Sequence, residues 1–104
     1  MPFVKVAQLS ALPPGAVTEI DLGGDLYALC NVGGRLSAIG GTCPHRGGPL
    51  GQGAMRGDNV VCPWHAWEWH CQTGANDFNP DQKVPVYAVR LDGDDILLDV
   101  PDRA

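Results

Sequence analysis

The chain has 104 residues, of which 44% are hydrophobic and 18% charged, and its formal net charge is −5 at pH 7. This length is enough for one folded domain with a modest core, so we expect a single domain over residues 1–104. The negative charge argues against nucleic acid as a partner, because phosphates would be repelled, and it is compatible with docking onto a basic protein face.

The N-terminal segment has one lysine among short apolar residues and no extended hydrophobic run, so it is unlike a signal peptide. No apolar stretch approaches the roughly 20 residues that cross a bilayer. We therefore expect a cytoplasmic protein without a membrane anchor. In a reducing compartment, four cysteines indicate metal binding or catalysis before they indicate disulfides.

Turn-forming residues are abundant, with fourteen glycines and nine prolines, which favours many short strands over long helices. The expected fold class is therefore all-β. Apolar segments on either side of glycine- or aspartate-rich turns predict strands at 17–22, 26–32, 35–39, 84–91 and 96–100. Segment 40–57 holds seven glycines and two prolines and is predicted to be mostly loop, followed by a short strand at 59–61.

Two loops carry paired cysteine and histidine residues, as Cys-Pro-His at 43–45 and, after sixteen intervening residues, Cys-Pro-Trp-His at 62–65. One reading is a structural zinc site, because two cysteines and two histidines are a common zinc ligand set. Zinc sites, however, more often pair Cys with Cys and His with His along the chain. The alternation favours a [2Fe-2S] cluster with both sulfurs on one iron and both nitrogens on the other. The proposed ligands are Cys43, His45, Cys62 and His65.

The segments Gly-Thr-Cys-Pro-His-Arg-Gly-Gly-Pro-Leu at 41–50 and Cys-Pro-Trp-His-Ala-Trp-Glu-Trp at 62–69 resemble the two cluster-binding boxes of Rieske [2Fe-2S] proteins. More loosely, the resemblance extends over nearly the whole chain. It implies small antiparallel sheets with one [2Fe-2S] cluster per chain at one tip. The cluster-binding part, about residues 41–80, would be inserted in the β scaffold. Glycines of this part would let backbone N–H groups approach the sulfides, at positions 47, 48, 51 and 53.

Within this family, the sequence resembles soluble bacterial ferredoxins of oxygenase systems more than respiratory members. Respiratory members carry an extra cysteine in each box, and Gly48 and Trp64 stand at those positions here. They also place serine and tyrosine hydroxyls near the cluster, where this chain has Trp67 and Trp69. Fewer hydrogen bonds to the cluster should lower its potential, so we expect the lower part of the Rieske range, which runs from roughly −150 to +300 mV.

A cluster whose ligands are all protein groups, with no nucleotide loop or open metal position nearby, passes electrons and has no place to transform a substrate. The chain is thus predicted to be an electron carrier and not an enzyme. The resemblance implies a monomer that takes electrons from a flavin-dependent reductase and delivers them to a terminal oxygenase, ring-hydroxylating or otherwise Rieske-type. Two alternatives are a small subunit of a larger enzyme such as nitrite reductase, and a redox-sensing binding module.

The cysteines outside the two boxes, Cys30 and Cys71, are predicted to be buried and inert, and the sequence leaves open whether a disulfide joins them. His70 is predicted to be exposed and is assigned no role. Core packing is expected for Trp67 and Trp69, because aromatic side chains dominate cores by area. Segment 79–81 is a candidate third loop beside the cluster. The candidate docking surface consists of Arg46, Pro49, Leu50 and Trp64.

Overall fold

The computed structural model describes residues 3–22, 24–42, 48–64, 67–76 and 82–99. Within this part the chain forms ten strands and two short 3-10 turns: β1 (Phe3–Gln8), η1 (Leu9–Ala11), β2 (Val17–Leu22), β3 (Asp25–Val32), β4 (Arg35–Gly40), η2 (Leu50–Gln52), β5 (Ala54–Arg56), β6 (Asn59–Val61), β7 (Glu68–His70), β8 (Val86–Tyr87), β9 (Val89–Asp92) and β10 (Asp95–Asp99). None of these elements is a helix long and apolar enough to span a membrane.

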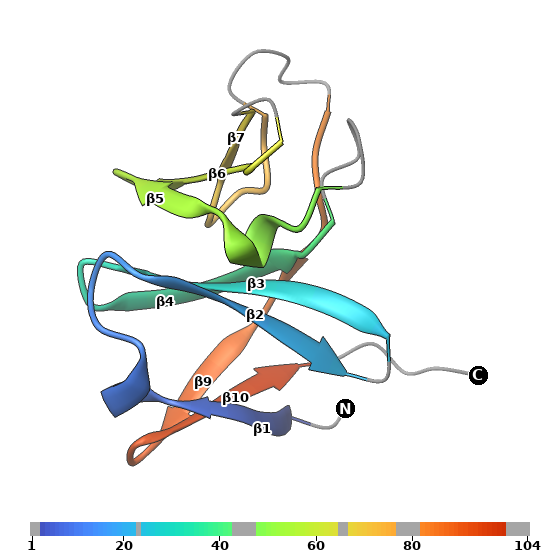
Figure 1. Ribbon diagram of the computed structural model, residues 1–104. Coiled ribbons are helices and arrows are strands. Elements are labelled where there is room, and N and C mark those ends of the chain that lie inside the picture. Colours follow the sequence, from blue (N-terminus) through green and yellow to red (C-terminus); the bar gives the residue numbers. More distant parts are fainter. Residues whose placement is uncertain (1–2, 23, 43–47, 65–66, 77–81, 100–104) are drawn as a thin grey trace.

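The strands pair into three antiparallel sheets, ordered β1-β10-β9, β2-β3-β4-β8 and β5-β6-β7. Figure 1 shows the sheets as successive layers, with β2, β3 and β4 between the other two. The β5-β6-β7 sheet, which we call the upper sheet, lies in the chain between β4 and β8. The observed architecture confirms the predicted all-β class.

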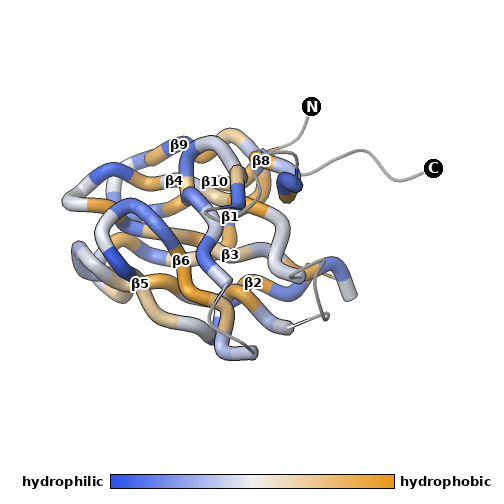
Figure 2. The backbone as a smooth tube through the Cα atoms, turned by 90° about the horizontal axis from the view of Figure 1, so that it is seen from above, coloured by the Kyte–Doolittle hydropathy of each residue, from blue (hydrophilic) through white to orange (hydrophobic). Residues whose placement is uncertain are grey.

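The β2-β3-β4-β8 sheet, which we call the middle sheet, is buried on both faces, and its strand β3 shows this most clearly. Successive side chains of a strand point to opposite faces. Tyr27 and Leu29 accordingly pack on one face, whereas Ala28 and Cys30 pack on the other. The apolar run of β3 therefore serves two separate cores. Hydrophobic residues recur in short stretches along the strands in Figure 2.

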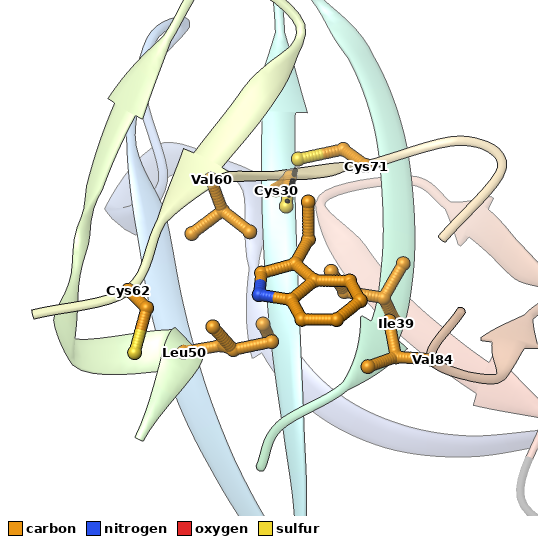
Figure 3. Close-up of a cluster of buried hydrophobic side chains, with 9 residues drawn as sticks. Cys30, Ile39, Leu50, Val60, Cys62, Cys71 and Val84 are labelled. Atoms are coloured by element: carbon orange, nitrogen blue, oxygen red, sulfur yellow. Dashed lines mark hydrogen bonds between the residues drawn. The ribbon is translucent and has the colours of Figure 1, made fainter. Parts of the chain in front are cut away.

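Each of the two cores packs a different outer sheet against the middle sheet. The lower core joins the middle sheet to the β1-β10-β9 sheet and consists of Leu12, Ile20, Tyr27, Leu29, Ala38, Ile96 and Leu98. The upper core joins the middle sheet to the upper sheet and consists of Ala28, Cys30, Ile39, Leu50, Val60, Cys62, Trp69, Cys71 and Val84. Figure 3 shows the upper core in close-up.

The predicted strands at 17–22, 26–32, 35–39, 59–61 and 96–100 are confirmed within a residue at each end, although residue 100 lies outside the described part. Two adjacent glycines make the turn between β3 and β4, as expected, with φ of 60° at Gly33 and 96° at Gly34. Positive φ at both central residues is what a tight hairpin turn needs. The hairpin of β9 and β10 also forms, around Asp92-Gly93-Asp94-Asp95.

One strand prediction is wrong in part. The single strand predicted at 84–91 is two strands, because the chain leaves the middle sheet after β8, which pairs with β4, and enters the β1-β10-β9 sheet as β9, which pairs with β10. Segment 40–57 was predicted to be mostly loop, and in its described part the short elements η2 and β5 form. The residues of β5 have little intrinsic strand preference, and its pairing with β6 makes the strand. Strands β1 and β7 were not predicted.

Turn η2 packs closely on β2, and glycine is required at the contact. Gly51 is buried, and a Cβ atom placed on it would overlap the backbone Cα of Glu19. The exposed Gln52 side chain donates a hydrogen bond to Glu19 over 3.0 Å beside this contact. A backbone atom cannot move aside as a side-chain end can, so Gly51 holds η2 against the middle sheet.

We predict that Gly51→Ala destabilises the fold by about 1–3 kcal/mol, because the added methyl group forces η2 away from β2. Urea unfolding would show a lower midpoint with an unchanged slope. Gln52→Ala, at the neighbouring exposed position, is the control and should change stability by less than about 0.5 kcal/mol. Equal midpoints for Gly51→Ala and the wild type would contradict the proposed packing.

Candidate metal centre

Of the four proposed ligands, Cys62 lies in the described part of the chain. Cys43, His45 and His65 lie outside the described residues, as do the candidate docking residue Arg46 and the candidate third loop at 79–81. The structure therefore shows the bases of the two ligand loops and the surroundings of one ligand sulfur.

The first ligand loop is closed at its base by backbone pairing. Thr42 and Pro49 form an antiparallel bridge, and the N–H of Leu50 donates to the carbonyl of Gly41 over 2.9 Å. Gly41 in turn donates to the carbonyl of Leu26 at the start of β3 over 2.8 Å. A Cβ on Gly41 would lie 2.6 Å from that backbone, so glycine is needed for this approach. The middle sheet thus anchors both ends of the loop.

The second ligand loop is the tip of the β6–β7 hairpin. Val61 pairs with Glu68, and just beyond this pair the N–H of Cys62 donates to the carbonyl of Trp67 over 2.7 Å. Glu68 also accepts hydrogen bonds from the side chains of Asn59 (3.0 Å) and Arg56 (3.2 Å), which tie β7 to the neighbouring strand β6 and to the end of β5. The loop therefore begins and ends on paired backbone.

The two loops meet at the sulfur of Cys62. A Cβ placed on Gly48, at the end of the first loop, would lie 2.6 Å from Cys62 Sγ and 3.2 Å from the ring of Trp64. The first loop can come this close only because residue 48 has no side chain. The described parts of the two loops therefore lie against each other, as ligands of one shared cluster would require.

The surroundings of Cys62 fit a thiolate that binds iron. The residue is 1% exposed, and the backbone N–H of Trp64 donates to its sulfur over 3.4 Å. Backbone N–H donors and burial are the means by which a protein tunes an iron–sulfur centre. A thiolate from Cys43 and imidazoles from His45 and His65, as predicted from the sequence, would complete the donor set for a [2Fe-2S] cluster of mixed ligation.

Not every loop glycine acts toward the cluster as predicted. Gly53 donates its N–H to the carbonyl of Leu50 over 3.0 Å, and a Cβ on it would overlap the carbonyl oxygen of Val61. Gly51 contacts β2, as described above. Gly51 therefore permits η2 to pack on β2, and Gly53 permits the chain after η2 to approach β6. Of the described glycines, only Gly48 lies against the sulfur of a proposed ligand.

The three tryptophans occupy different environments. Trp69 is fully buried in the upper core, as predicted, and Trp67 is half-buried beside it with ring centroids 6.3 Å apart. Trp64 is 49% exposed next to Cys62, so it presents apolar surface to solvent at the site. The indole N–H of Trp69 is buried and has no hydrogen-bond partner among the described residues. Buried donors are rarely unpaired, so this one needs an acceptor.

Two residues that were predicted to be exposed are more buried than expected. Leu50 was placed on the docking surface, but it is fully buried in the upper core, because η2 turns its side chain inward. His70 was predicted to be exposed, but it is half-buried, and its Nδ1 accepts the N–H groups of Gln72 (3.1 Å) and Thr73 (3.2 Å). His70 thus stabilises the turn after β7, a role that residue type alone did not reveal.

Comparison with known proteins agrees with this geometry. A family model described as Rieske [2Fe-2S] domain matches residues 2–88. The ferredoxin component of biphenyl 2,3-dioxygenase from Rhodococcus jostii (strain RHA1) is 32% identical over 102 residues, which cover 96% of this chain and 94% of that protein.

Solved structures give the same result. The ferredoxin of carbazole 1,9a-dioxygenase from Nocardioides aromaticivorans IC177 is 31% identical, with a TM-score of 0.84 over 94% of this chain and 97% of that one. A chain in the complex of reduced oxygenase and oxidized ferredoxin in carbazole 1,9a-dioxygenase is 26% identical, with a TM-score of 0.84 over 92% of this chain and 91% of that one.

The family model spans both loops that carry the cysteine and histidine residues, and the relatives match over nearly their whole length. These findings confirm the resemblance inferred from the two boxes and answer the zinc alternative, since the family is defined by an iron–sulfur cluster. The chain belongs to the Rieske [2Fe-2S] domain family, and this membership implies a [2Fe-2S] cluster as its cofactor.

Proposed function

We propose that the chain is a ferredoxin that carries single electrons from a reductase to a terminal oxygenase. The observation that carries this proposal is the share of the dioxygenase ferredoxins' own length that this chain matches. The biphenyl and carbazole dioxygenase ferredoxins are matched over 94% and 97% of their own lengths, so this chain corresponds to whole carrier proteins. The chain is thus an electron-carrier component of an oxidoreductase system and not its catalytic subunit.

Its partners follow from the same likeness. The carbazole dioxygenase structure is described as a complex of oxygenase and ferredoxin, which supports a terminal oxygenase as the electron acceptor here. A flavin-dependent reductase is the proposed donor, and the chain is proposed to act as a cytoplasmic monomer. The net charge of −5 suits docking to basic faces on both partners. The single-domain organisation, with the cluster-binding part at about 41–80, stays a prediction.

The proposed ligands are Cys43 and Cys62 on one iron and His45 and His65 on the other. When bound, the cluster supplies reversible uptake of one electron. Cys62 is buried. If each loop holds its histidine further out than its cysteine, the histidine side is the exit for electrons. The exposed ring of Trp64, next to Cys62, and the half-buried Pro49 are the described residues that remain candidates for the docking surface.

Substitution of a proposed histidine ligand should change the spectra of the cluster, whereas substitution of a histidine outside the ligand set should not. We predict that His65→Asn abolishes the absorption and electron paramagnetic resonance (EPR) spectra of mixed Cys/His ligation, because an amide is a poor ligand for iron in this site. His70→Asn is the matched control and should keep both spectra, because His70 only accepts backbone N–H groups. Intact spectra in His65→Asn would remove His65 from the ligand set.

The carrier function predicts reversible uptake of one electron per chain. Redox titration of the anaerobic protein should give a single one-electron step in the lower part of the range of roughly −150 to +300 mV. Reduced protein should then reoxidise on mixing with the oxygenase component of a biphenyl-type dioxygenase, more slowly at high salt because docking is electrostatic. Absence of a reversible step would overturn the proposal, whereas a step without transfer to that oxygenase would overturn only the choice of acceptor.

The unpaired indole N–H of Trp69 is proposed to donate toward the cluster and its ligand sulfurs. Trp69 belongs to the same buried core as Cys62, and sulfur acceptors would satisfy its donor. We predict that Trp69→Phe keeps the cluster but lowers its potential by tens of millivolts, since about 59 mV corresponds to a tenfold change for one electron. Trp67→Phe, at the half-buried neighbour, is the control. An unchanged potential in Trp69→Phe would show that the donor is satisfied elsewhere.

A further inference from the structure

The upper core contains a second pair of cysteines, separate from the proposed ligands. Cys30 belongs to β3 of the middle sheet, and Cys71 directly follows β7 of the upper sheet. Both side chains are fully buried, and their Sγ atoms are 2.6 Å apart. Figure 3 shows the two sulfurs facing each other, with Cys62 at the opposite end of the same core.

We propose that Cys30 and Cys71 are a redox pair that closes reversibly into a disulfide, joining the middle sheet to the upper sheet. The proposal rests on the position of these two thiols and not on the electron-carrier function. The sequence leaves open whether a disulfide joins Cys30 and Cys71, because their separation along the chain does not indicate that they are in contact.

Both thiols are placed by backbone structure on either side of the contact. The alternation along β3 directs Cys30, with Ala28, to the upper face of the middle sheet. The N–H of Cys71 donates to the carbonyl of Asp58 over 3.0 Å, which fixes the start of the turn after β7. Met55 of β5 covers the pair, with its Sδ atom 3.8 Å from Cys71 Sγ. A disulfide has an S–S bond of about 2.05 Å, so a small local movement is enough to form it.

The bond forms by thiol–disulfide exchange with a small-molecule disulfide such as oxidised glutathione. A thiolate of the pair attacks one sulfur of the reagent and releases one thiol, and the second cysteine then attacks the mixed disulfide and releases the other. In total, two S–H bonds of the protein are lost and one S–S bond forms. Two electrons and two protons pass to the reagent, which leaves as two thiols.

Burial controls the rate of this exchange. The hydrogen bond with Cys71, followed by burial, raises the pKa of the Cys30 thiol far above its ordinary value, and only the thiolate is nucleophilic. The closed dithiol therefore reacts slowly. Reaction becomes faster when the upper sheet separates from the middle sheet and the thiols reach solvent, so mild denaturant should accelerate it.

The position of the link gives it a consequence for the site. The cysteines are 41 residues apart, and the chain between them contains Cys43, His45, Cys62 and His65. A disulfide would therefore hold both ligand loops on one closed loop of chain. Because a cross-link restricts the unfolded chain, the oxidised apo-protein should melt at least about 5 °C higher than the reduced apo-protein.

The test is thiol counting on the full-length holoprotein. The protein is equilibrated with oxidised glutathione, with and without urea below the unfolding midpoint, and then denatured in the presence of an alkylating reagent. We expect two of the four cysteines to be alkylated after oxidation and all four after reduction with a phosphine, with faster oxidation in urea. Alkylation of all four after oxidation in urea, or retention of a glutathione adduct, would overturn the proposal.

Peptide mapping identifies the bond. Cleavage after arginine and lysine leaves Cys30 in peptide 6–35, Cys43 in 36–46, and both Cys62 and Cys71 in 57–83. The expected link joins 6–35 to 57–83, with Cys62 alkylated. A link from 36–46 would instead show oxidation of released ligands and would count against the pair. Cys71→Ala should abolish the expected link, whereas Met55→Leu, which removes only the covering sulfur, should retain it.

Discussion

Strand β3 is buried on both faces, and the other layers of the protein are built against it. Its alternate side chains supply Tyr27 and Leu29 to the lower core and Ala28 and Cys30 to the upper core. A strand in this position cannot shift by one residue, because every side chain would exchange faces. The register of the middle sheet therefore determines where both outer sheets attach, and through them where the ligand loops emerge.

The site depends on this arrangement through backbone contacts. The first ligand loop is anchored to β3 through Gly41 and to β2 through Gly51, and the second begins on the β6–β7 hairpin. The loops then meet where Gly48 lies against the sulfur of Cys62. Glycine at these three positions permits backbone approaches that any side chain would block. A carrier benefits from such rigidity, because a redox centre that is held in place requires little rearrangement when its charge changes.

The chain also contains two sets of sulfur atoms with opposite environments. Cys62 receives a backbone N–H at the edge of the upper core, next to the exposed Trp64. Cys30 and Cys71 are enclosed at the other end of that core, where the hydrogen bond with Cys71 and burial disfavour the thiolate of Cys30. Cysteine thus serves two proposed roles in this chain, as a cluster ligand and as a cross-link. The two environments differ in whether a backbone N–H group donates to the sulfur and in how near the sulfur lies to solvent.

The sequence by itself determined the fold class, most strand positions, the family and the ligand candidates, because turn glycines, apolar alternation and the spacing of cysteine and histidine are local patterns. It did not determine which sheet a strand joins, as the division of 84–91 between two sheets shows. Burial of Leu50 and the meeting of Cys30 with Cys71 were likewise decided by tertiary structure. Such contacts join residues far apart in the chain, and they exist only once the sheets have stacked.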